Sequence, residues 1–483
     1  MKAPLPTPPS EARGHVLAVA YYFPPIDVVG TQRTLAFVRE LRPLGWRASA
    51  LTVSNPQAFR VDEALLDQLP GDCRVYRSTN LEPFETYHAI KNRLRRLRGQ
   101  EALPHQLPAI LSASGERTRP HGFFRRVLSY LSWYLATPDK MVGWTPFAVA
   151  RGAWALREDR PEVIYSSGPP HTCHLIAGSL ARLWNCAWVA DFRDPWVDNP
   201  FVTIPVPSIA RWSTWLERWA VTRADRVICN TPAVERAFQS RYTDQPRDKF
   251  VTITNGYSPR DFEGLPAWCP EPGRLRIAYT GAIYGKRSPE SLIRVLARWM
   301  ATRPEDAREI ELVFAGVAEN QATLERLIRE GGLEGQVRFL GTVSSRRSLE
   351  ILAESDLQLM LGPQGEEAEL QVPGKLFTYF GVGRPVFSLS KRGGVIQEIL
   401  ERSGVEYYQA EPGDESDIEQ ALERALAAAR RGTLGRERRE LSLREFEHPS
   451  LAERLSEVFD AAIDVRRGRS DSWPPAPEPD GRS

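Results

Sequence analysis

Two stretches of the sequence open in the same way: LAVAYYFPPIDVVGTQRTLAFVREL at residues 17–41 and LRIAYTGAIYGKRSPESLIRVLARW at residues 275–299. Each begins with an apolar run that ends in Ala-Tyr, continues through a loop that contains glycine, and ends in a segment with the apolar spacing of a helix. A strand, a loop and a helix in this order form the first unit of a parallel sheet covered by helices. The repetition predicts two such sheets.

The alternation of short apolar runs and longer amphipathic segments continues through each half of the chain. In the first half we expect strands at 16–22, 47–53, 163–166, 187–191, 226–229 and 250–254, and helices at 31–44, 146–158, 171–183, 207–223 and 232–240. In the second half we expect strands at 275–280, 310–315, 337–340, 357–361, 385–388 and 405–408, and helices at 288–301, 320–330, 345–354, 374–382 and 394–402. The pattern predicts an α/β fold of two doubly wound, Rossmann-like parallel sheets, whose carboxyl edges would face a cleft.

A segment rich in proline and glycine, SPRDFEGLPAWCPEPGRL at 258–275, interrupts the alternation and predicts a linker. We therefore expect a first domain over 1–265, with an insertion at about 80–140, and a second domain over 266–445. Residues 446–465 are expected to form a helix that returns to the first domain. Residues 466–483 are charged and rich in proline, and we expect them to be disordered.

Composition excludes several classes of protein. The chain of 483 residues has 63 lysines and arginines against 61 acidic residues, so its net charge of +2 creates no general attraction for nucleic acid. Its five cysteines show no C-x-x-C spacing, which indicates reduced thiols in a cytoplasmic protein. The first apolar run leads into Pro-Pro and is expected to be a strand and not a signal peptide. No apolar run is long enough to span a membrane.

Glycines and cations in three loops point to an anionic ligand. Gly30 follows the first strand, where it is either a phosphate contact beside a helix N-terminus or only a tight turn. The loop between the first strand and the first helix of the second half contains Gly281, Lys286 and Arg287. It either forms a diphosphate site or only carries two solvated cations. Lys375 falls in the first turn of a predicted helix, where the dipole disfavours a cation, so an anion is expected nearby.

Six motifs in order resemble family 4 glycosyltransferases of the GT-B fold, in the branch that builds bacterial surface polysaccharides. They are YYFPP with GTQR (21–33), SSGPPHTCHLIAGSLAR (166–182), WVADFRDPW (188–196), ITNGY (253–257), YTGAIYGKRSPESL (279–292) and VPGKLFTYFGVGRPV (372–386). The resemblance covers about residues 15–465. It implies transfer of a sugar from a nucleotide-diphosphate donor to an acceptor hydroxyl, with retention at the anomeric carbon and with neither a metal nor another cofactor.

The resemblance also implies roles for the loop residues. Gly30 matches a glycine whose backbone meets the donor phosphates, Gly281 belongs to the motif of the second half, and Lys286 and Arg287 match or adjoin the basic pair that neutralises the leaving diphosphate. Lys375 lies within the motif that reads the donor. Many relatives carry two glutamates eight positions apart in this motif, where this chain has Leu370 and Thr378. Thr378 could bind a ribose hydroxyl, and Glu369 adjoins the first of these positions.

The charges after the strand at 187–191 match a loop that lines the acceptor side in this branch. We expect Asp191, Arg193 and Asp194 to be exposed at the rim of the cleft and to shape the reaction centre. The alternative is a structural ion pair in which Arg193 clamps both carboxylates. His171 begins a predicted helix near the same rim and either bonds a hydroxyl or caps the helix, whereas His174 is expected in the core.

The predicted insertion contains a basic stretch, KNRLRRLR at 91–98, and an amphipathic aromatic stretch, GFFRRVLSYLSWYLATPDK at 122–140. These stretches either lie on an anionic membrane face or pack on the first sheet with a solvated flank.

We expect a glycosyltransferase that is cytoplasmic or peripheral on the inner face of the membrane, with a glycan or lipid-linked acceptor. The alternatives are a sugar-nucleotide epimerase of the same fold and a non-catalytic subunit of a polysaccharide assembly complex.

Overall fold

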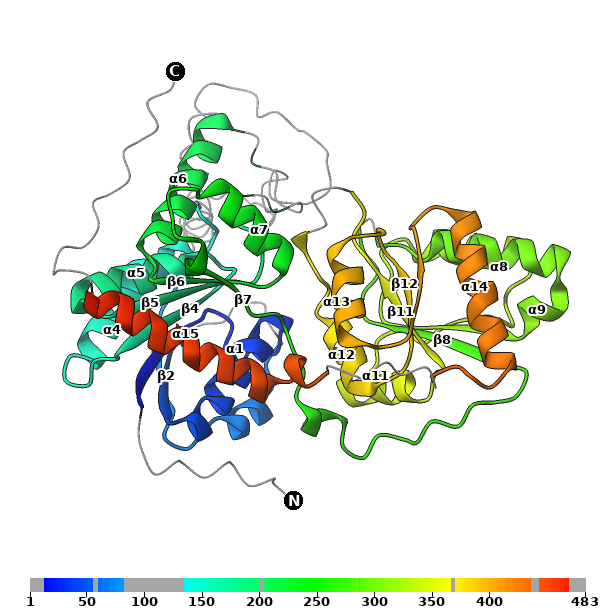
Figure 1. The fold of residues 1–483 in the computed structure, drawn as a ribbon, viewed down its shortest axis with the longest axis horizontal. Coiled ribbons are helices and arrows are strands. Elements are labelled where there is room, and N and C mark those ends of the chain that lie inside the picture. Colours follow the sequence, from blue (N-terminus) through cyan, green and yellow to red (C-terminus); the bar gives the residue numbers. More distant parts are fainter. Residues whose placement is uncertain are drawn as a thin grey trace, which may run out of the picture. The chain divides into compact units, whose positions relative to one another are not determined.

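A computed structural model describes residues 13–54, 60–81, 134, 136–197, 199, 204, 206–285, 287–365, 370–435 and 443–468. The chain divides into two compact units (Figure 1). Unit 1 comprises Met1–Ile253 with Ala452–Ser483, and unit 2 comprises Thr254–Leu451. Most of the expected insertion, including both of its quoted stretches up to Trp133, lies outside the described residues.

Unit 1 is built on a seven-stranded sheet in which all neighbouring strands are parallel. In the order β3-β2-β1-β4-β5-β6-β7, its strands are Arg74–Ser78, Trp46–Val53, Gly14–Val19, Val163–Gly168, Ala187–Phe192, Arg226–Cys229 and Phe250–Thr252. Its helices are α1 (Val29–Glu40), α4 (Thr145–Ala155), α5 (Thr172–Trp184), α6 (Pro207–Arg223), α7 (Pro232–Arg241) and the C-terminal part of α15 (His448–Gly468). Every residue of β4 and β5 is buried, as expected of central strands covered on both faces.

Unit 2 repeats this plan with six parallel strands. In the order β10-β9-β8-β11-β12-β13, they are Val337–Phe339, Ile310–Ala315, Leu275–Thr280, Leu357–Leu361, Val386–Leu389 and Tyr407–Ala410. Its helices are α8 (Glu290–Thr302), α9 (Pro304–Arg308), α10 (Gln321–Glu330), α11 (Ser345–Ala353), α12 (Lys375–Val382), α13 (Val395–Ser403) and α14 (Glu415–Arg430).

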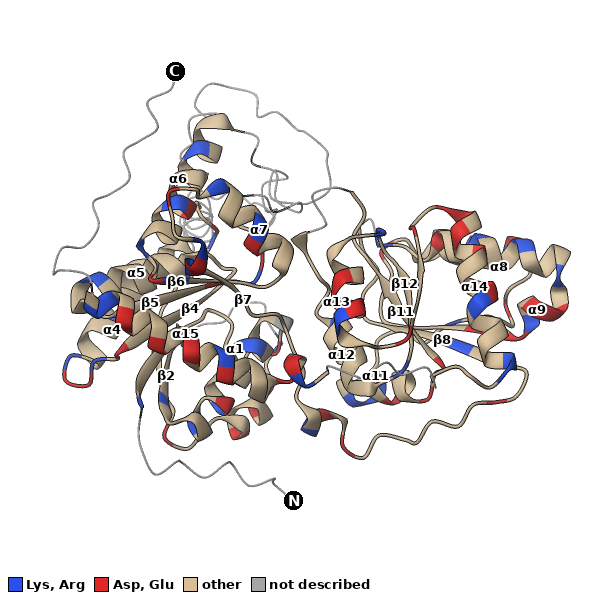
Figure 2. Ribbon diagram, viewed as in Figure 1, with Lys and Arg blue, Asp and Glu red and all other residues tan. Residues whose placement is uncertain are grey.

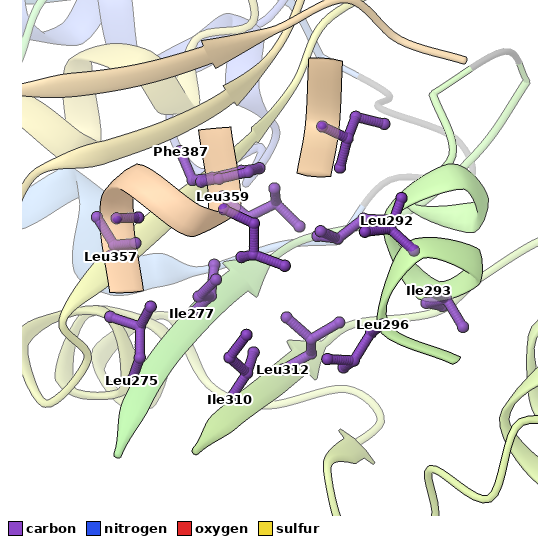
Figure 3. Packing of buried hydrophobic residues seen from close by; sticks show 14 of the residues in the cluster. Leu275, Ile277, Leu292, Ile293, Leu296, Ile310, Leu312, Leu357, Leu359 and Phe387 are labelled. Carbon is purple, nitrogen blue, oxygen red and sulfur yellow. The ribbon is translucent and has the colours of Figure 1, made fainter. Parts of the chain in front are cut away.

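Branched apolar side chains fill the space between the second sheet and its helices. Figure 3 shows this core, in which the strands contribute Leu275, Ile277, Ile310, Leu312, Leu357 and Leu359, and α8 contributes Leu292, Ile293 and Leu296. Apolar residues at three- and four-residue spacing place one face of α8 on the sheet, which explains why this helix forms here.

Basic and acidic residues are interspersed on the outer helices of unit 2 (Figure 2). Arg298 of α8 pairs with Glu415 and Glu419 of α14, and Arg430 of α14 pairs with Asp306 of α9. Such exposed pairs contribute little to stability individually. They balance the charge of this face, in accordance with the small net charge of the chain.

The prediction of two doubly wound parallel sheets is confirmed. The expected linker at 258–275 is not a free connection, because the structure packs it on unit 2: Trp268 donates to Asp356 at 2.9 Å, and Arg346 donates to the carbonyl oxygen of Glu263 at 2.9 Å. Helix α15 crosses from unit 2 into unit 1, where Phe459 packs against Trp46.

In both sheets the order of strands reverses at the first strand, between β1 and β4 in unit 1 and between β8 and β11 in unit 2. Ligands of doubly wound folds bind beyond the carboxyl ends of the strands at such a reversal. The loops that follow β1, β4, β5, β8 and β11 are therefore the first places to look for a site.

Candidate active site

The carboxylate of Asp191 is completely buried near the carboxyl end of β5. It accepts two hydrogen bonds from Arg33, at 2.9 and 3.0 Å, one from Ser167 at 3.3 Å and a short one from the hydroxyl of Tyr165. The expectation that Asp191 is exposed at the rim is wrong. It is buried because α1 supplies Arg33, a fully charged partner that satisfies both oxygens.

Arg33 connects Asp191 to the rest of unit 1. Its guanidinium also donates to the carbonyl oxygen of Ile253 at 2.8 Å and lies 4.9 Å from the ring centre of Phe37. Burial and the charge of Asp191 raise the pKa of Tyr165 well above its usual value, so its hydroxyl stays protonated and donates. This network ties α1 to β4, β5 and the residue after β7, which makes Asp191 a structural residue.

Arg193 binds backbone carbonyl groups and, within the part of the chain that the structure describes, no carboxylate. It donates to Gly30 at 2.7 Å, to Gly168 at 3.3 Å and, through a short contact, to Pro169. The alternative in which Arg193 clamps two carboxylates is therefore also wrong. The three acceptors belong to the first turn of α1, to the last residue of β4 and to the loop after β4, so Arg193 fixes two loops at the strand-order reversal.

Gly30 leaves no room for a side chain. A Cβ atom at this position would lie 2.6 Å from Nη1 of Arg193 and 2.9 Å from Cδ2 of Tyr22. No described side chain caps the N-terminus of α1, where the amide of Thr31 donates to the carbonyl oxygen of Val28 at 2.9 Å. Glycine is required here for the close approach of Arg193, and the phosphate contact stays a prediction.

His171 precedes α5 but does not cap it. Asp139 caps this helix, accepting from the amide of Thr172 at 2.9 Å and from its hydroxyl at 2.7 Å. The imidazole of His171 stacks on Trp196, with ring centres 4.6 Å apart and 7° between the planes. Its Nδ1 is buried and has no hydrogen-bond partner among the described residues.

The imidazole of His171 is neutral at physiological pH. Burial, followed by the charges of His174 and Arg193, holds the pKa of His171 well below its usual value. His174 is fully buried, bonds Ser166 at 2.9 Å and lies in the core as expected. A neutral imidazole can accept a hydrogen bond, which suits a group that meets a hydroxyl, although its lowered pKa disfavours uptake of a proton.

Hydrogen bonds to two residues of α6 hold the loop after β5 in place. The indole of Trp196 donates to Ser213 at 3.1 Å, and the amide of Val197 donates to the buried carboxylate of Glu217 at 2.9 Å. Asp194 lies in this loop and is half-buried, as is Arg193.

In unit 2, Lys375 reaches from the first turn of α12 to the end of β8. Its ammonium group donates to the carbonyl oxygen of Thr280 at 3.1 Å and lies 3.7 Å from the ring centre of Tyr279. A Cβ atom on Gly281, whose φ is +119°, would lie 2.8 Å from Nζ of Lys375. Gly281 and Lys375, both predicted from the sequence, therefore meet at the strand-order reversal of the second sheet.

Burial lowers the pKa of Lys375 to about 7, and repulsion by the nearby charge of Arg287 acts in the same direction. The guanidinium of Arg287 lies over the ring of Tyr284, 5.3 Å from its centre. Two cations that repel each other in a partly dry place lower the free energy of a bound anion. The arrangement is therefore suited to a phosphate or diphosphate.

The structure describes only some of the other residues that were expected to bind the donor. Thr378 is partly buried on α12, three residues after Lys375 and thus on the same face of the helix. Leu370 is described, whereas Lys286 and Glu369 lie outside the described residues. A pocket beyond β11 and β12 is lined by Pro363, Gln371, Ser390 and Lys391, among others.

Backbone packing fixes the loop that follows β8. A Cβ atom on Gly316, which follows β9 and has a φ of +146°, would lie 2.3 Å from the carbonyl oxygen of Gly281. The amide of Gly281 donates to Ala315 at 2.7 Å. Gly316 thus packs against Gly281, and Gly281 packs against Lys375. This packing determines where the ammonium group lies.

Sequence reasoning missed four residues that organise these sites: Arg33, Asp139, Trp196 and Tyr279. A signal existed for Tyr279, because the Ala-Tyr pair ends the opening apolar run of both halves. Arg33 occurs in the quoted GTQR motif, but its partner Asp191 is 158 residues away, and no spacing reveals such a pair. Among the described residues, no group of three or more His, Cys, Asp or Glu side chains could hold a metal ion.

Comparison with known proteins gives one match to a family of domains. Residues 30–256 match the glycosyl transferase 4-like domain. The search of curated proteins found no match.

Solved structures match nearly the whole chain. HepE from Anabaena, in complex with UDP and glucose, shares 13% identity and a TM-score of 0.57, covering 93% of this chain and 100% of its own. Sucrose-phosphate synthase from Thermosynechococcus elongatus shares 16% identity and a TM-score of 0.55, covering 94% and 100%. A TarM variant from S. aureus, in complex with fondaparinux, α-GlcNAc-glycerol and UDP, shares 10% identity and a TM-score of 0.55, covering 93% and 100%. The two units therefore have the GT-B fold, as predicted.

Proposed function

We propose that this protein is a glycosyltransferase that moves a sugar from a nucleotide-diphosphate donor to an acceptor hydroxyl, with retention and without a metal. The match of residues 30–256 to a glycosyl transferase 4-like domain and the GT-B fold support this proposal. So do the ligands of two structural neighbours, because HepE was solved with UDP and glucose and the TarM variant with UDP.

The observation that carries the proposal is the position of Lys375. Its ammonium group lies at the strand-order reversal of unit 2, against Gly281 and close enough to Arg287 for the two charges to repel. Departure of a nucleoside diphosphate builds negative charge on the leaving phosphate, and fixed cations stabilise that charge in the transition state. Unit 2 therefore binds the donor in this proposal, with Thr378 toward the ribose.

Unit 1 binds the acceptor in this proposal. The neutral imidazole of His171, held flat against Trp196, accepts a hydrogen bond from the attacking hydroxyl or from the sugar. Arg193, in the loop after β5, bonds the carbonyl oxygen of Gly30 and so fixes the backbone of this loop. In this proposal Asp194, half-buried in the same loop, contributes to binding the acceptor. Asp191 acts only by holding α1 and β5 together.

The acceptor is proposed to be a glycan or a lipid-linked precursor, reached at the inner face of an anionic membrane. The support is the sequence alone, in which residues 91–98 carry five cations and residues 122–140 form an amphipathic aromatic stretch. No described helix is long and apolar enough to cross a membrane. The protein should sediment with vesicles that contain anionic lipid, and a variant neutralised at Arg93, Arg95, Arg96 and Arg98 should not. Equal sedimentation of both proteins would contradict membrane docking.

Binding and product analysis test the proposal. Thermal unfolding with UDP, GDP, ADP and their common sugar conjugates should reveal one stabilising nucleotide, since a ligand that binds only the folded state raises its stability. Incubation of the matching nucleotide sugar with membrane extract should release the nucleoside diphosphate, and Lys375→Ala should reduce this turnover on the order of a hundredfold. Turnover of donor into an isomer without any acceptor would indicate an epimerase instead.

One observation favours a second function, that of a non-catalytic subunit in a polysaccharide assembly complex. Leu370 and Thr378 stand where many related transferases carry glutamates, so two polar donor contacts are replaced. In that case no nucleotide or nucleotide sugar would shift the unfolding temperature. Restoration of both acids, in the double variant Leu370→Glu and Thr378→Glu, would then be expected to create nucleotide binding.

A further inference from the structure

We infer that Tyr279 is a positioning residue whose ring face holds the ammonium group of Lys375 in place for the phosphates of the donor. This inference rests on the proposed function, because it assigns a task to a side chain behind the same cation. The ring centre lies 3.7 Å from Nζ, while the carbonyl oxygen of Thr280 lies 3.1 Å from it and Gly281 closes a third side.

The ring can perform this task because it is itself immobilised. Tyr279 is the penultimate residue of β8 and is only 1% exposed. Its hydroxyl donates to the carbonyl oxygen of Ala282 at 2.9 Å, beyond the strand, and its ring packs against that of Phe314 on β9, with centres 6.4 Å apart. The aromatic face beneath Lys375 is therefore fixed at both ends of the side chain.

A ring face suits this position better than a carboxylate would. An ammonium group has three N–H donors, and one of them is used by Thr280. The aromatic face attracts the positive charge through its quadrupole and needs no N–H directed at an acceptor oxygen. It also adds no negative charge, so the attraction of Lys375 for an anion is not cancelled. The remaining donors can face the phosphates.

The chemistry of the neighbourhood explains why such support is needed. Burial and Arg287 both disfavour the charged form of Lys375 and lower its pKa to about 7. Among the described residues, Tyr279 favours the ammonium form by its ring and Thr280 by its carbonyl dipole. Without the ring, the amine would lose its proton at lower pH and its position over β8.

The experiment compares Tyr279→Phe with Tyr279→Leu. Calorimetry from pH 5.5 to 8.5 measures the affinity of each variant for UDP. If GDP or ADP stabilises the wild type instead, that nucleotide replaces UDP. Phenylalanine keeps the ring face and its packing on Phe314 but loses the hydroxyl bond to Ala282, so binding should weaken far less than in the leucine variant. Leucine should weaken binding about tenfold at neutral pH and move the fall of affinity to lower pH. In a Lys375→Met background, the same leucine substitution should cause no further loss.

A second series keeps the inference testable if leucine destabilises the fold. Phenylalanine with one to five ring fluorines at position 279 preserves the shape of the ring and progressively removes the negative charge of its face. Affinity should fall steadily along this series. The inference would be overturned, and the proposed function would stand, if affinity stayed equal along the fluorinated series. The same holds if the leucine substitution weakened binding equally in the Lys375→Met background. Absence of nucleotide binding in the wild type would overturn the proposed function and the inference with it.

Discussion

Arg33 of α1 binds both oxygens of the buried carboxylate of Asp191 on β5, and these two residues are 158 positions apart in the sequence. Removal of one partner leaves the other charged in a dry place, which costs about 3–5 kcal/mol. Asp191→Ala should therefore lower the free energy of unfolding of unit 1 by this amount, as measured by urea denaturation.

The matched control for Asp191→Ala removes both charges. The double variant Arg33→Met with Asp191→Leu replaces the pair by apolar groups and should recover most of the lost stability, because no unpaired charge remains. If Asp191→Ala lost less than about 1 kcal/mol, the carboxylate would have to be solvated, as the sequence had suggested, and its structural role would be wrong.

Arg193 should not be replaceable by lysine. Its planar fork reaches three carbonyl oxygens, those of Gly30, Gly168 and Pro169, and a single ammonium group cannot reproduce that geometry. Within the proposed function, we expect Arg193→Lys and Arg193→Ala to reduce kcat/KM similarly, by at least about tenfold. A lysine variant with wild-type kinetics would show that only the charge matters.

Affinity for the nucleoside diphosphate should fall as the pH rises above about 7, the pKa of Lys375. The ammonium form binds the anion, and above this pH binding must first restore a proton, at a cost of about tenfold in affinity for each pH unit. Below it the free protein is already protonated, and this dependence disappears. Lys375→Arg stays charged and should show no such fall, which makes it the control for titration of the ligand itself.

Gly281→Ala should abolish nucleotide binding, whereas Gly285→Ala should preserve it. Both glycines have positive φ and belong to the same loop. A Cβ atom on Gly281 meets Nζ of Lys375 at 2.8 Å, while one on Gly285 meets nothing within 4 Å. Calorimetric titration of both variants compares the two effects, although backbone strain is larger at Gly281, whose φ is +119°, than at Gly285, whose φ is +58°. Equal losses would mean that strain alone explains the effect.

His171→Phe should retain the stack on Trp196 and lose only the nitrogen atoms. We expect turnover to fall by about a hundredfold with unchanged stability, since a group that accepts a proton or hydrogen bond contributes on this scale. Because burial keeps the pKa of His171 well below its usual value, the wild-type rate should show no change from its titration between pH 6 and pH 8. A rate that dropped on acidification through pH 6.5 would contradict a neutral, buried imidazole.

Local patterns were sufficient to predict the layers of the fold and the glycine loops. Apolar runs of central strands stand out because both of their faces are buried, as in β4 and β5. Strand β3 was missed because it lies at the edge of the sheet and its residues are largely half-exposed, and α14 was missed beyond the last predicted strand. Lys375 was found because a cation in a first helical turn needs an explanation.

Contacts between distant parts of the chain account for what the sequence did not reveal. The charges of DFRDPW predicted an exposed rim. In the structure Arg33 pairs with Asp191 in the interior, and backbone carbonyl groups accept hydrogen bonds from Arg193. The pairing of Tyr279 with Lys375 likewise joins β8 to α12 across 96 positions of sequence. Such relationships depend on which loops the topology brings to one edge, and a single sequence does not show this.

The contact between Gly316 and Gly281 has a practical consequence for altering donor choice by mutagenesis. Any side chain at Gly316 would press on Gly281 and, through it, on the cation. Libraries that randomise the two loops together would consist mostly of inactive members, because both positions admit glycine alone. Diversity is better directed to Thr378 and Gln371, where side chains already exist and the backbone would tolerate exchange.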